Sequence, residues 1–277
     1  MKRESEFLML QFIDTHTHLY DEAFLGEEDD AVRRATDAGV DRMIVPDIDS
    51  STRESMFSFT RRHPSVTFPC LGLHPTSVKA DYQEELDKVF QCEETGIKAI
   101  GEIGLDFYWS TEFVSQQQEA LRAQLDLAAR RDLPVIIHSR KSTKAILDIL
   151  EDFRGRGLRG VMHAFSGSIE TFRQIERLGD WLVGIGGVLT YKKASIAETV
   201  KDIPLEKILL ETDSPYLTPV PFRGKRNESA YIPFIAERLA IIKGCSLEQV
   251  ASQTSANAET LFNIWFNHQN TANQPYC

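Results

Sequence analysis

Cysteine is scarce in this sequence, and long apolar runs are missing. The four cysteines, Cys70, Cys92, Cys245 and Cys277, form no close pairs, which argues against a disulfide-stabilised secreted domain and favours a reducing compartment. The apolar run at residues 7–10 is too short for the core of a signal peptide, and no later segment has the length of a membrane span. We therefore expect a cytoplasmic protein without a membrane partner.

An excess of positive charge is also missing. The 277 residues carry a formal net charge of −10 at pH 7, whereas proteins that hold long nucleic acids usually show a basic stripe. We therefore expect no extended footprint on duplex DNA, and nothing in the sequence points to an obligate protein partner. A local pocket for a short strand is compatible with an acidic protein, because surface fields are screened beyond about 10 Å.

Other common features are lacking as well. No glycine-rich dinucleotide or phosphate loop follows any expected strand, which argues against an open nucleotide-binding sheet. No repeat, low-complexity segment or linker divides the chain. We expect one domain at residues 12–266, with an N-terminal extension at 1–11 and a polar tail at 267–277.

What the sequence does contain is a regular alternation of short apolar strands and helical patterns. The expected strands are 12–18, 40–45, 66–73, 98–103, 134–138, 160–164, 181–185 and 207–211. Eight such units predict an α/β fold, a closed (β/α)8 TIM-type barrel, regular or distorted; the alternative is an open doubly wound sheet.

The helical patterns lie between and after these strands. We expect helices at 28–38, 52–62, 82–94, 143–153, 169–178, 195–200, 231–243, 246–253 and 258–265, and one that begins near Ser115. Ser115 with Gln118, and Ser246 with Gln249, have the spacing of capping boxes, which mark the start of a helix.

The histidines follow the expected strands closely. In a parallel barrel the carboxyl ends of the strands meet at one face, where active sites lie. Five of the seven histidines fall at such ends, together with two carboxylates. These residues are His16, His18, His74, Glu102, His138, His163 and Asp213. A single histidine of this kind is usually an ordinary buried residue, but the joint pattern favours a metal site.

The residue types fit that chemistry. Imidazole binds zinc and similar ions, and a carboxylate can bridge two of them. We expect His16, His18 and Asp213 to form one set of ligands and His138 with His163 a second, with Glu102 shared. Two ions about 3.5–4 Å apart would activate a water for hydrolysis, which suits a chain with no evident serine or cysteine nucleophile.

Seven motifs carry a resemblance to a known family. They are Phe-Ile-Asp-Thr-His-Thr-His at 12–18, Gly-Leu-His-Pro at 72–75, Gly-Glu-Ile-Gly-Leu-Asp-Phe at 101–107, Pro-Val-Ile-Ile-His-Ser-Arg at 134–140, His-Ala-Phe-Ser-Gly at 163–167, Glu-Thr-Asp-Ser-Pro-Tyr-Leu at 211–217 and Arg-Gly-Lys-Arg-Asn-Glu at 223–228. From Phe12 to about Phe262 the chain resembles the TatD-type metal-dependent deoxyribonucleases, within the amidohydrolase-like barrels.

The resemblance implies roles for individual residues. It implies His16, His18, Glu102, His138, His163 and Asp213 as metal ligands, His74 in the substrate pocket, and removal of nucleotides from DNA ends. The chain departs from the family pattern at Tyr20, where Asp or Asn is usual, at Ser142 and Lys144, where a small residue and an acid are usual, and at Ser229, where Pro is usual. None of these is a predicted ligand, so the departures concern substrate preference and loop shape.

Several residues near the expected centre have more than one interpretation. Asp213 could be a ligand, the general base or both, and otherwise a helix cap. The basic residues Arg223, Lys225 and Arg226, with Arg140, could bind substrate phosphates or form a solvated charge cluster. The aromatic residues at 107–109 could stack a base or pack in the core.

Taken together, the sequence predicts a hydrolase with two divalent ions that cleaves phosphodiester bonds, with Asp213 and Glu102 as catalytic residues and DNA ends or short single strands as substrate. The alternative is hydrolysis of a small amide, ester or lactone at the same site; a third interpretation is a binding protein without turnover. The resemblance implies magnesium, but four histidines favour zinc or manganese.

Overall fold

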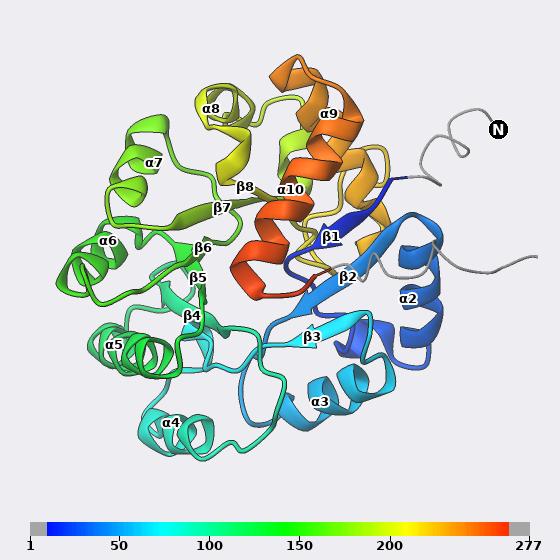
Figure 1. The fold of residues 1–277 in the computed structure, drawn as a ribbon. Coiled ribbons are helices and arrows are strands. Elements are labelled where there is room, and N and C mark those ends of the chain that lie inside the picture. Colours follow the sequence, from blue (N-terminus) through cyan, green and yellow to red (C-terminus); the bar gives the residue numbers. More distant parts are fainter. Residues whose placement is uncertain (1–9, 266–277) are drawn as a thin grey trace, which may run out of the picture.

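The computed structural model describes residues 10–265, which form a ring of strands surrounded by helices (Figure 1). The strands of this range are β1 (Phe12–Asp14), β2 (Val40–Val45), β3 (Thr67–Pro69), β4 (Ile100–Asp106), β5 (Val135–Arg140), β6 (Gly160–Met162), β7 (Trp181–Ile185) and β8 (Ile208–Leu210). The α-helices are α2 (Glu28–Asp37), α3 (Arg53–Arg62), α4 (Tyr82–Phe90), α5 (Val114–Arg131), α6 (Thr143–Asp152), α7 (Ile169–Glu176), α8 (Ile196–Asp202), α9 (Ile232–Lys243) and α10 (Leu247–Phe262). Short 3-10 helices are η1 (Glu22–Phe24), η2 (Pro75–Ser77), η3 (Gly187–Thr190), η4 (Leu205–Lys207) and η5 (Ser229–Tyr231).

The strands close into a parallel barrel made of two sheets. One sheet has the order β1-β2-β3 and the other β4-β5-β6-β7-β8. Isolated parallel bridges join them at Leu71–Ile100 and at Thr17–Ser214, and the backbone N–H of Thr15 donates to the Leu210 carbonyl at 3.0 Å. The predicted (β/α)8 barrel is confirmed in its distorted form, since β1, β3, β6 and β8 have only 3 residues each.

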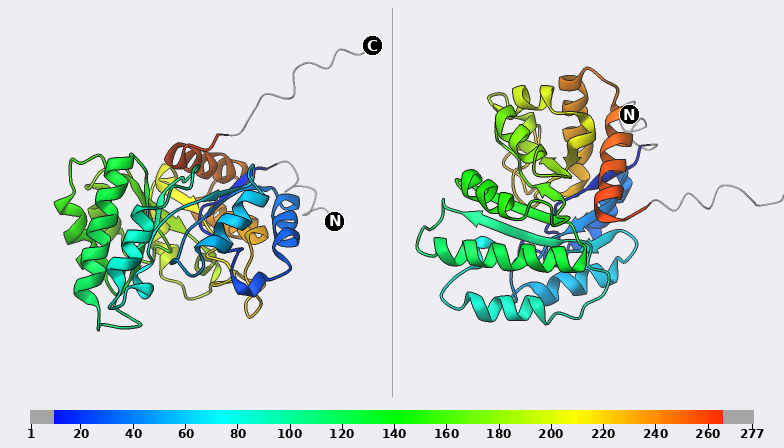
Figure 2. Two further views of the ribbon diagram at one scale, coloured as in Figure 1. Left: turned by 90° about the horizontal axis from the view of Figure 1, so that it is seen from below. Right: turned by 60° about the vertical axis from the view of Figure 1, so that its left-hand side comes forward.

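Two apolar layers arise from the alternation of side chains along each strand. Ile136 faces the inside of the barrel, whereas Ile137 belongs to the layer between strands and helices, because successive strand residues face opposite sides. The inner layer is closed by Leu261 and Phe262 of α10, which lies across one end of the barrel (Figures 1 and 2). This apolar plug leaves the opposite end, where the strands finish, for polar residues.

The two predicted capping boxes had different outcomes. Ser246 and Gln249 form both bonds of the box at the start of α10, as predicted. The prediction at Ser115 is wrong: α5 begins at Val114 without a side-chain cap, and the Ser115 hydroxyl donates to the side chain of Gln116.

The C-terminal helices were also predicted wrongly as two separate helices. α10 continues through Asn257. The Asn257 side-chain amide donates to the carbonyls of Leu205 and Ile208, each at 2.9 Å. These tertiary bonds satisfy a residue that in isolation favours a helix end.

The first strand is shorter than predicted. β1 ends at Asp14, whose carboxylate accepts the backbone N–H groups of His16 at 3.2 Å and Thr212 at 3.0 Å. The chain therefore leaves the sheet before the two histidines. Residues 1–9 of the predicted extension and the predicted tail at 267–277 lie outside the described residues. Across residues 10–265, no helix combines the length and apolar character needed to cross a membrane.

Candidate metal centre

The predicted strand-end residues converge at the end of the barrel opposite α10. His16, His18 and His163 are buried, and the side chain of Glu102 is only 3 % exposed. Asp213 is the more accessible carboxylate, with 19 % of its side chain exposed. Three overlapping groups of these residues have the spacing of metal ligands: His16, His18 and Asp213; His16, Glu102 and His163; and His74, Glu102 and His138.

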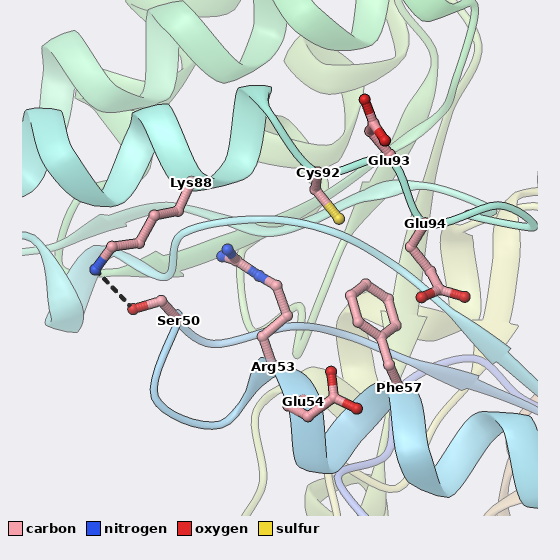
Figure 3. Close-up of a pocket in the computed structure, with 8 residues that line it drawn as sticks. All are labelled: Ser50, Arg53, Glu54, Phe57, Lys88, Cys92, Glu93 and Glu94. Atoms are coloured by element: carbon pink, nitrogen blue, oxygen red, sulfur yellow. Dashed lines mark hydrogen bonds between the residues drawn. The ribbon is translucent and has the colours of Figure 1, made fainter.

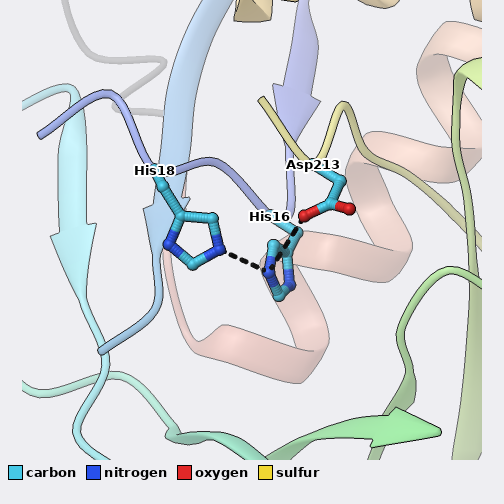
Figure 4. Close-up of side chains that lie close together, drawn as sticks. All are labelled: His16, His18 and Asp213. Atoms are coloured by element: carbon cyan, nitrogen blue, oxygen red, sulfur yellow. Dashed lines mark hydrogen bonds and ion pairs between the residues drawn. The ribbon is translucent and has the colours of Figure 1, made fainter. Parts of the chain in front are cut away.

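In the first group and on the neighbouring Glu102, atoms with lone pairs face one another. His16 Nε2 and His18 Nε2 are 3.1 Å apart (Figure 4). Glu102 Oε2 lies 3.1 Å from His16 Nε2 and 3.7 Å from His18 Nε2, and Asp213 Oδ1 lies 3.8 Å from His16 Nε2. Such a convergence of acceptor atoms in a buried place is unfavourable unless a cation or a proton lies between them.

These separations fit a divalent ion. Two ligand atoms that each lie 2.0–2.1 Å from a tetrahedral ion are about 3.3–3.4 Å apart. The separations of 3.1, 3.7 and 3.8 Å around His16 and His18 bracket that value. The nitrogen-rich donor set suits zinc or manganese better than magnesium.

The other two groups differ from the predicted pairing. His138 does not share a group with His163; instead its Nδ1 lies 2.8 Å from Glu102 Oε1 and 3.3 Å from His74 Nε2. His163 stacks on His16 with ring centroids 3.5 Å apart, and its Nε2 lies 3.9 Å from Glu102 Oε1. Oε2 of Glu102 thus faces His16 and His18, whereas Oε1 faces His74, His138 and His163.

The cause of this pairing is a second carboxylate. Asp106 Oδ2 lies 3.0 Å from His138 Nε2, which turns the opposite nitrogen of the ring toward Glu102. Burial lowers the pKa of His138, but the hydrogen bonds to Asp106 and Glu102 outweigh it and raise the pKa to about 9. Asp106 was not among the predicted site residues, although it stands in the motif Gly-Glu-Ile-Gly-Leu-Asp-Phe.

Glu211 does for His163 what Asp106 does for His138. Glu211 Oε1 lies 3.1 Å from His163 Nδ1 and accepts the backbone N–H of Ala164 at 2.7 Å. Burial opposes the positive charge on His163, but Glu211, Asp213 and Glu102 raise its pKa to about 10. A side chain at Gly184 on β7 would collide with the Glu211 carboxylate, so only glycine leaves room for it. Glu211 was also missed, although it opens the motif before Asp213.

Hydroxyl groups, not carboxylates, lie behind His18 and His74. The Tyr20 hydroxyl donates to the Pro46 carbonyl at 2.8 Å and lies 3.3 Å from His18 Nδ1, so it accepts the Nδ1–H of His18 and leaves Nε2 as the lone-pair atom. Burial lowers the pKa of His18 to about 4. Tyr20, a departure from the family pattern, therefore belongs to the site.

His74 has the opposite arrangement. Its Nδ1 accepts the backbone N–H of Thr76 at 3.2 Å, which places the ring hydrogen on Nε2. That nitrogen lies 3.5 Å from Glu102 Oε1. His74 is therefore arranged as a hydrogen-bond donor, and its place in the substrate pocket stays a prediction.

The four predicted basic residues lie outside the three groups. The guanidinium of Arg140 lies 4.0 Å from the ring centroid of Tyr108, and that of Arg223 lies 4.2 Å from Tyr191. Lys225 Nζ lies 5.9 Å from the ring of Phe222. Arg226 donates to the Ala23 carbonyl and to Glu27 at 2.7 Å, so its guanidinium is held by the segment around η1.

A separate pocket opens on the outside of the barrel between α3 and α4 (Figure 3). It has a volume of about 430 Å³ and is lined by Ser50, Arg53, Glu54, Phe57, Lys88, Cys92, Glu93 and Glu94. Arg53 turns inward from it to bind Asp47 at 2.7 Å. The pocket includes no strand-end histidine, so the candidate site remains the open end of the barrel.

Known proteins are similar to this chain in both sequence and fold. The model of the family described as "TatD related DNase" matches residues 13–263. The chain is 36% identical to YabD of Bacillus subtilis, an uncharacterized metal-dependent hydrolase, over 91% of this chain and 98% of that protein. It is 30% identical to a protein of Erwinia tasmaniensis named "3'-5' ssDNA/RNA exonuclease TatD", over 91% of this chain and 99% of that protein.

A solved structure agrees with these sequence matches. The crystal structure of YjjV, a TatD homologue from Escherichia coli, superposes with a TM-score of 0.84 at 32% identity, covering 91% of this chain and 98% of that chain. Both the predicted family and its metal dependence are thus confirmed. The chain belongs to the TatD-related DNases, a family of metal-dependent hydrolases.

Proposed function

We propose that this protein is a two-metal phosphodiester hydrolase that removes nucleotides from DNA ends or short single strands. The observation that carries the proposal is the position of Glu102. Its Oε2 faces His16 at 3.1 Å, and its Oε1 faces His138 at 2.8 Å, as expected of a carboxylate that joins two ions. The relative named as an exonuclease of single-stranded DNA and RNA supports the choice of substrate.

The residues would divide the work as follows. His16, His18, Glu102, His138, His163 and Asp213 would hold divalent ions. Such ions polarise the scissile phosphate and lower the pKa of an attacking water. Asp213 is the carboxylate that solvent reaches, with 19 % of its side chain exposed, so we assign it to accept the proton of that water. His74 would donate its Nε2 hydrogen toward Glu102 or a substrate oxygen.

The basic residues would bind the strand. Arg140 is the exposed last residue of β5, and Arg223 and Lys225 are exposed on the loop that follows β8. Guanidinium groups suit the geometry of phosphate. Arg226 would act through its ion pair with Glu27, which fixes the loop that carries Arg223 and Lys225.

The test is turnover by protein depleted of metal and reloaded with zinc, manganese or magnesium. We expect removal of nucleotides from a labelled single strand, loss of activity on chelation, and loss in Asp213→Asn. Asp126→Asn, a change at an exposed ion pair on α5, should retain activity. Efficient hydrolysis of a panel of lactones, esters and amides without any cleavage of DNA would overturn the proposal in favour of the small-substrate alternative.

A further inference from the structure

Exposed aromatic side chains gather near the candidate metal centre. Among the described residues, four tyrosine and tryptophan side chains are exposed to solvent. Their exposed fractions are 48% for Tyr108, 68% for Trp109, 58% for Tyr216 and 59% for Trp265. The first three follow β4 and β8 at the end of the barrel that holds the histidines, whereas Trp265 follows α10 at the other end. Large apolar side chains left in solvent beside a reactive site indicate a ligand surface.

The turn that carries Tyr108 and Trp109 is tied to the centre by one carboxylate. Asp106 Oδ1 accepts the backbone N–H of Tyr108 at 2.9 Å and that of Trp109 at 3.1 Å, while its Oδ2 lies 3.0 Å from His138 Nε2. Phe107, in contrast, packs against the main core. The backbone that carries the two exposed rings is therefore held in place relative to His138.

Positive charge accompanies the same two rings. The Arg140 guanidinium lies 4.0 Å from the centroid of Tyr108 and 5.1 Å from that of Trp109. Lys141 Nζ lies 5.0 Å from Tyr108. Aromatic faces combined with cations can bind bases and phosphates of single strands together. Here the combination is local, on a protein whose net charge is −10.

We propose that Tyr108, Trp109 and Arg140 form a stacking platform for unpaired nucleobases of the strand whose phosphate lies at the metal centre. This inference rests on the proposed function and narrows its substrate. In a duplex the faces of the bases are already covered by their neighbours, so an aromatic platform selects strands with unpaired bases near the cleaved end.

The test is the affinity of the metal-loaded protein for a short single strand with uncleavable phosphorothioate linkages. A second strand has the same backbone but lacks bases at its terminal nucleotides. Trp109→Ala should weaken binding of the first strand roughly 5- to 150-fold, the loss of one stacked base, and leave binding of the second unchanged. Trp109→Phe should retain most of the affinity. Trp265→Ala, a change at another exposed tryptophan at the far end of the barrel, should retain all of it.

Fluorescence gives an independent readout. The base-bearing strand should quench tryptophan emission in the wild type but not in Trp109→Ala. Equal losses for both strands, or no loss in Trp109→Ala, would overturn the platform and leave DNA hydrolysis by the wild type standing. Base-dependent binding without cleavage of an ordinary strand in any metal would overturn the proposed hydrolysis and leave the platform standing.

Discussion

The two sheets of the barrel contribute different chemistry to the candidate metal centre. The sheet β1–β3 is followed by His16, His18 and His74. Hydroxyl groups lie behind His18 and His74. Within residues 10–265 the buried Nδ1 atoms of His16 and of His163 have no hydrogen-bond partner, but only that of His163 faces a carboxylate, Glu211 Oε1 at 3.1 Å. The sheet β4–β8 and the loops after it supply Glu102, Asp106, Glu211 and Asp213, and carboxylates lie behind both of its histidines.

This difference between the two sheets indicates that carboxylates on the β4–β8 side would balance most of the charge of a bound ion. A carboxylate behind an imidazole fixes the tautomer and makes the ring a stronger donor, whereas a hydroxyl mainly fixes its orientation. Burial lowers the pKa of His18 to about 4, while neighbouring carboxylates raise that of His163 to about 10 against the effect of burial. Substitutions on the β4–β8 side should therefore have larger effects than substitutions on the β1–β3 side.

The largest effect is expected at Glu102, where the two sides meet. Glu102→Ala removes the carboxylate that contacts His16, His18 and His138. Loss of a group that only hydrogen-bonds a metal ligand lowers metal affinity or activity roughly 10- to 100-fold. In Glu102→Ala, metal content and nuclease activity should fall by more than that. Elemental analysis measures the metal content, and the oligonucleotide assay measures the activity. Glu102→Gln should show the same losses as Glu102→Ala, because both variants remove the negative charge. Full metal content with unchanged activity in Glu102→Ala would contradict the shared role.

A smaller loss is expected when only the carboxylate behind one histidine is neutralised. Glu211→Gln keeps the size of the side chain and an oxygen for the backbone N–H of Ala164, but removes the charge beside His163. Metal affinity, followed by titration with a coloured chelator, should fall about 10- to 100-fold.

The matched control for Glu211→Gln lies at the opposite end of β8. Glu206 is exposed just before β8, whereas Glu211 directly follows it, so Glu206→Gln removes the same charge at the far end of the barrel and should leave metal affinity unchanged. Equal losses in the two variants would mean that net charge, not the contact with His163, sets the affinity.

The sequence predicts the strand-end residues of this site but not the contacts between their side chains, and the reason is physical. Strand ends of a parallel barrel must meet, so the positions of His16, His138 and Asp213 follow from the alternation of strands and helices alone. The contacts of Asp106 and Glu211 depend on how an imidazole is rotated within its pocket, which no spacing encodes. The same applies to the grouping of His138 with His74 and Glu102 rather than with His163.

The smallest effect is expected on the β1–β3 side, in Tyr20→Phe. The change removes one neutral hydrogen bond to His18 Nδ1 but keeps the ring, whose centroid lies 5.8 Å from that of His18. A neutral bond contributes about 0.5–1.5 kcal/mol, so metal affinity should fall roughly 2- to 13-fold in the same titration. In the double variant with Glu211→Gln the two losses should add if the sides act independently. A loss in Tyr20→Phe as large as that in Glu211→Gln would instead show that orienting an imidazole matters as much as placing a charge behind it, and the contrast between the two sheets would fail.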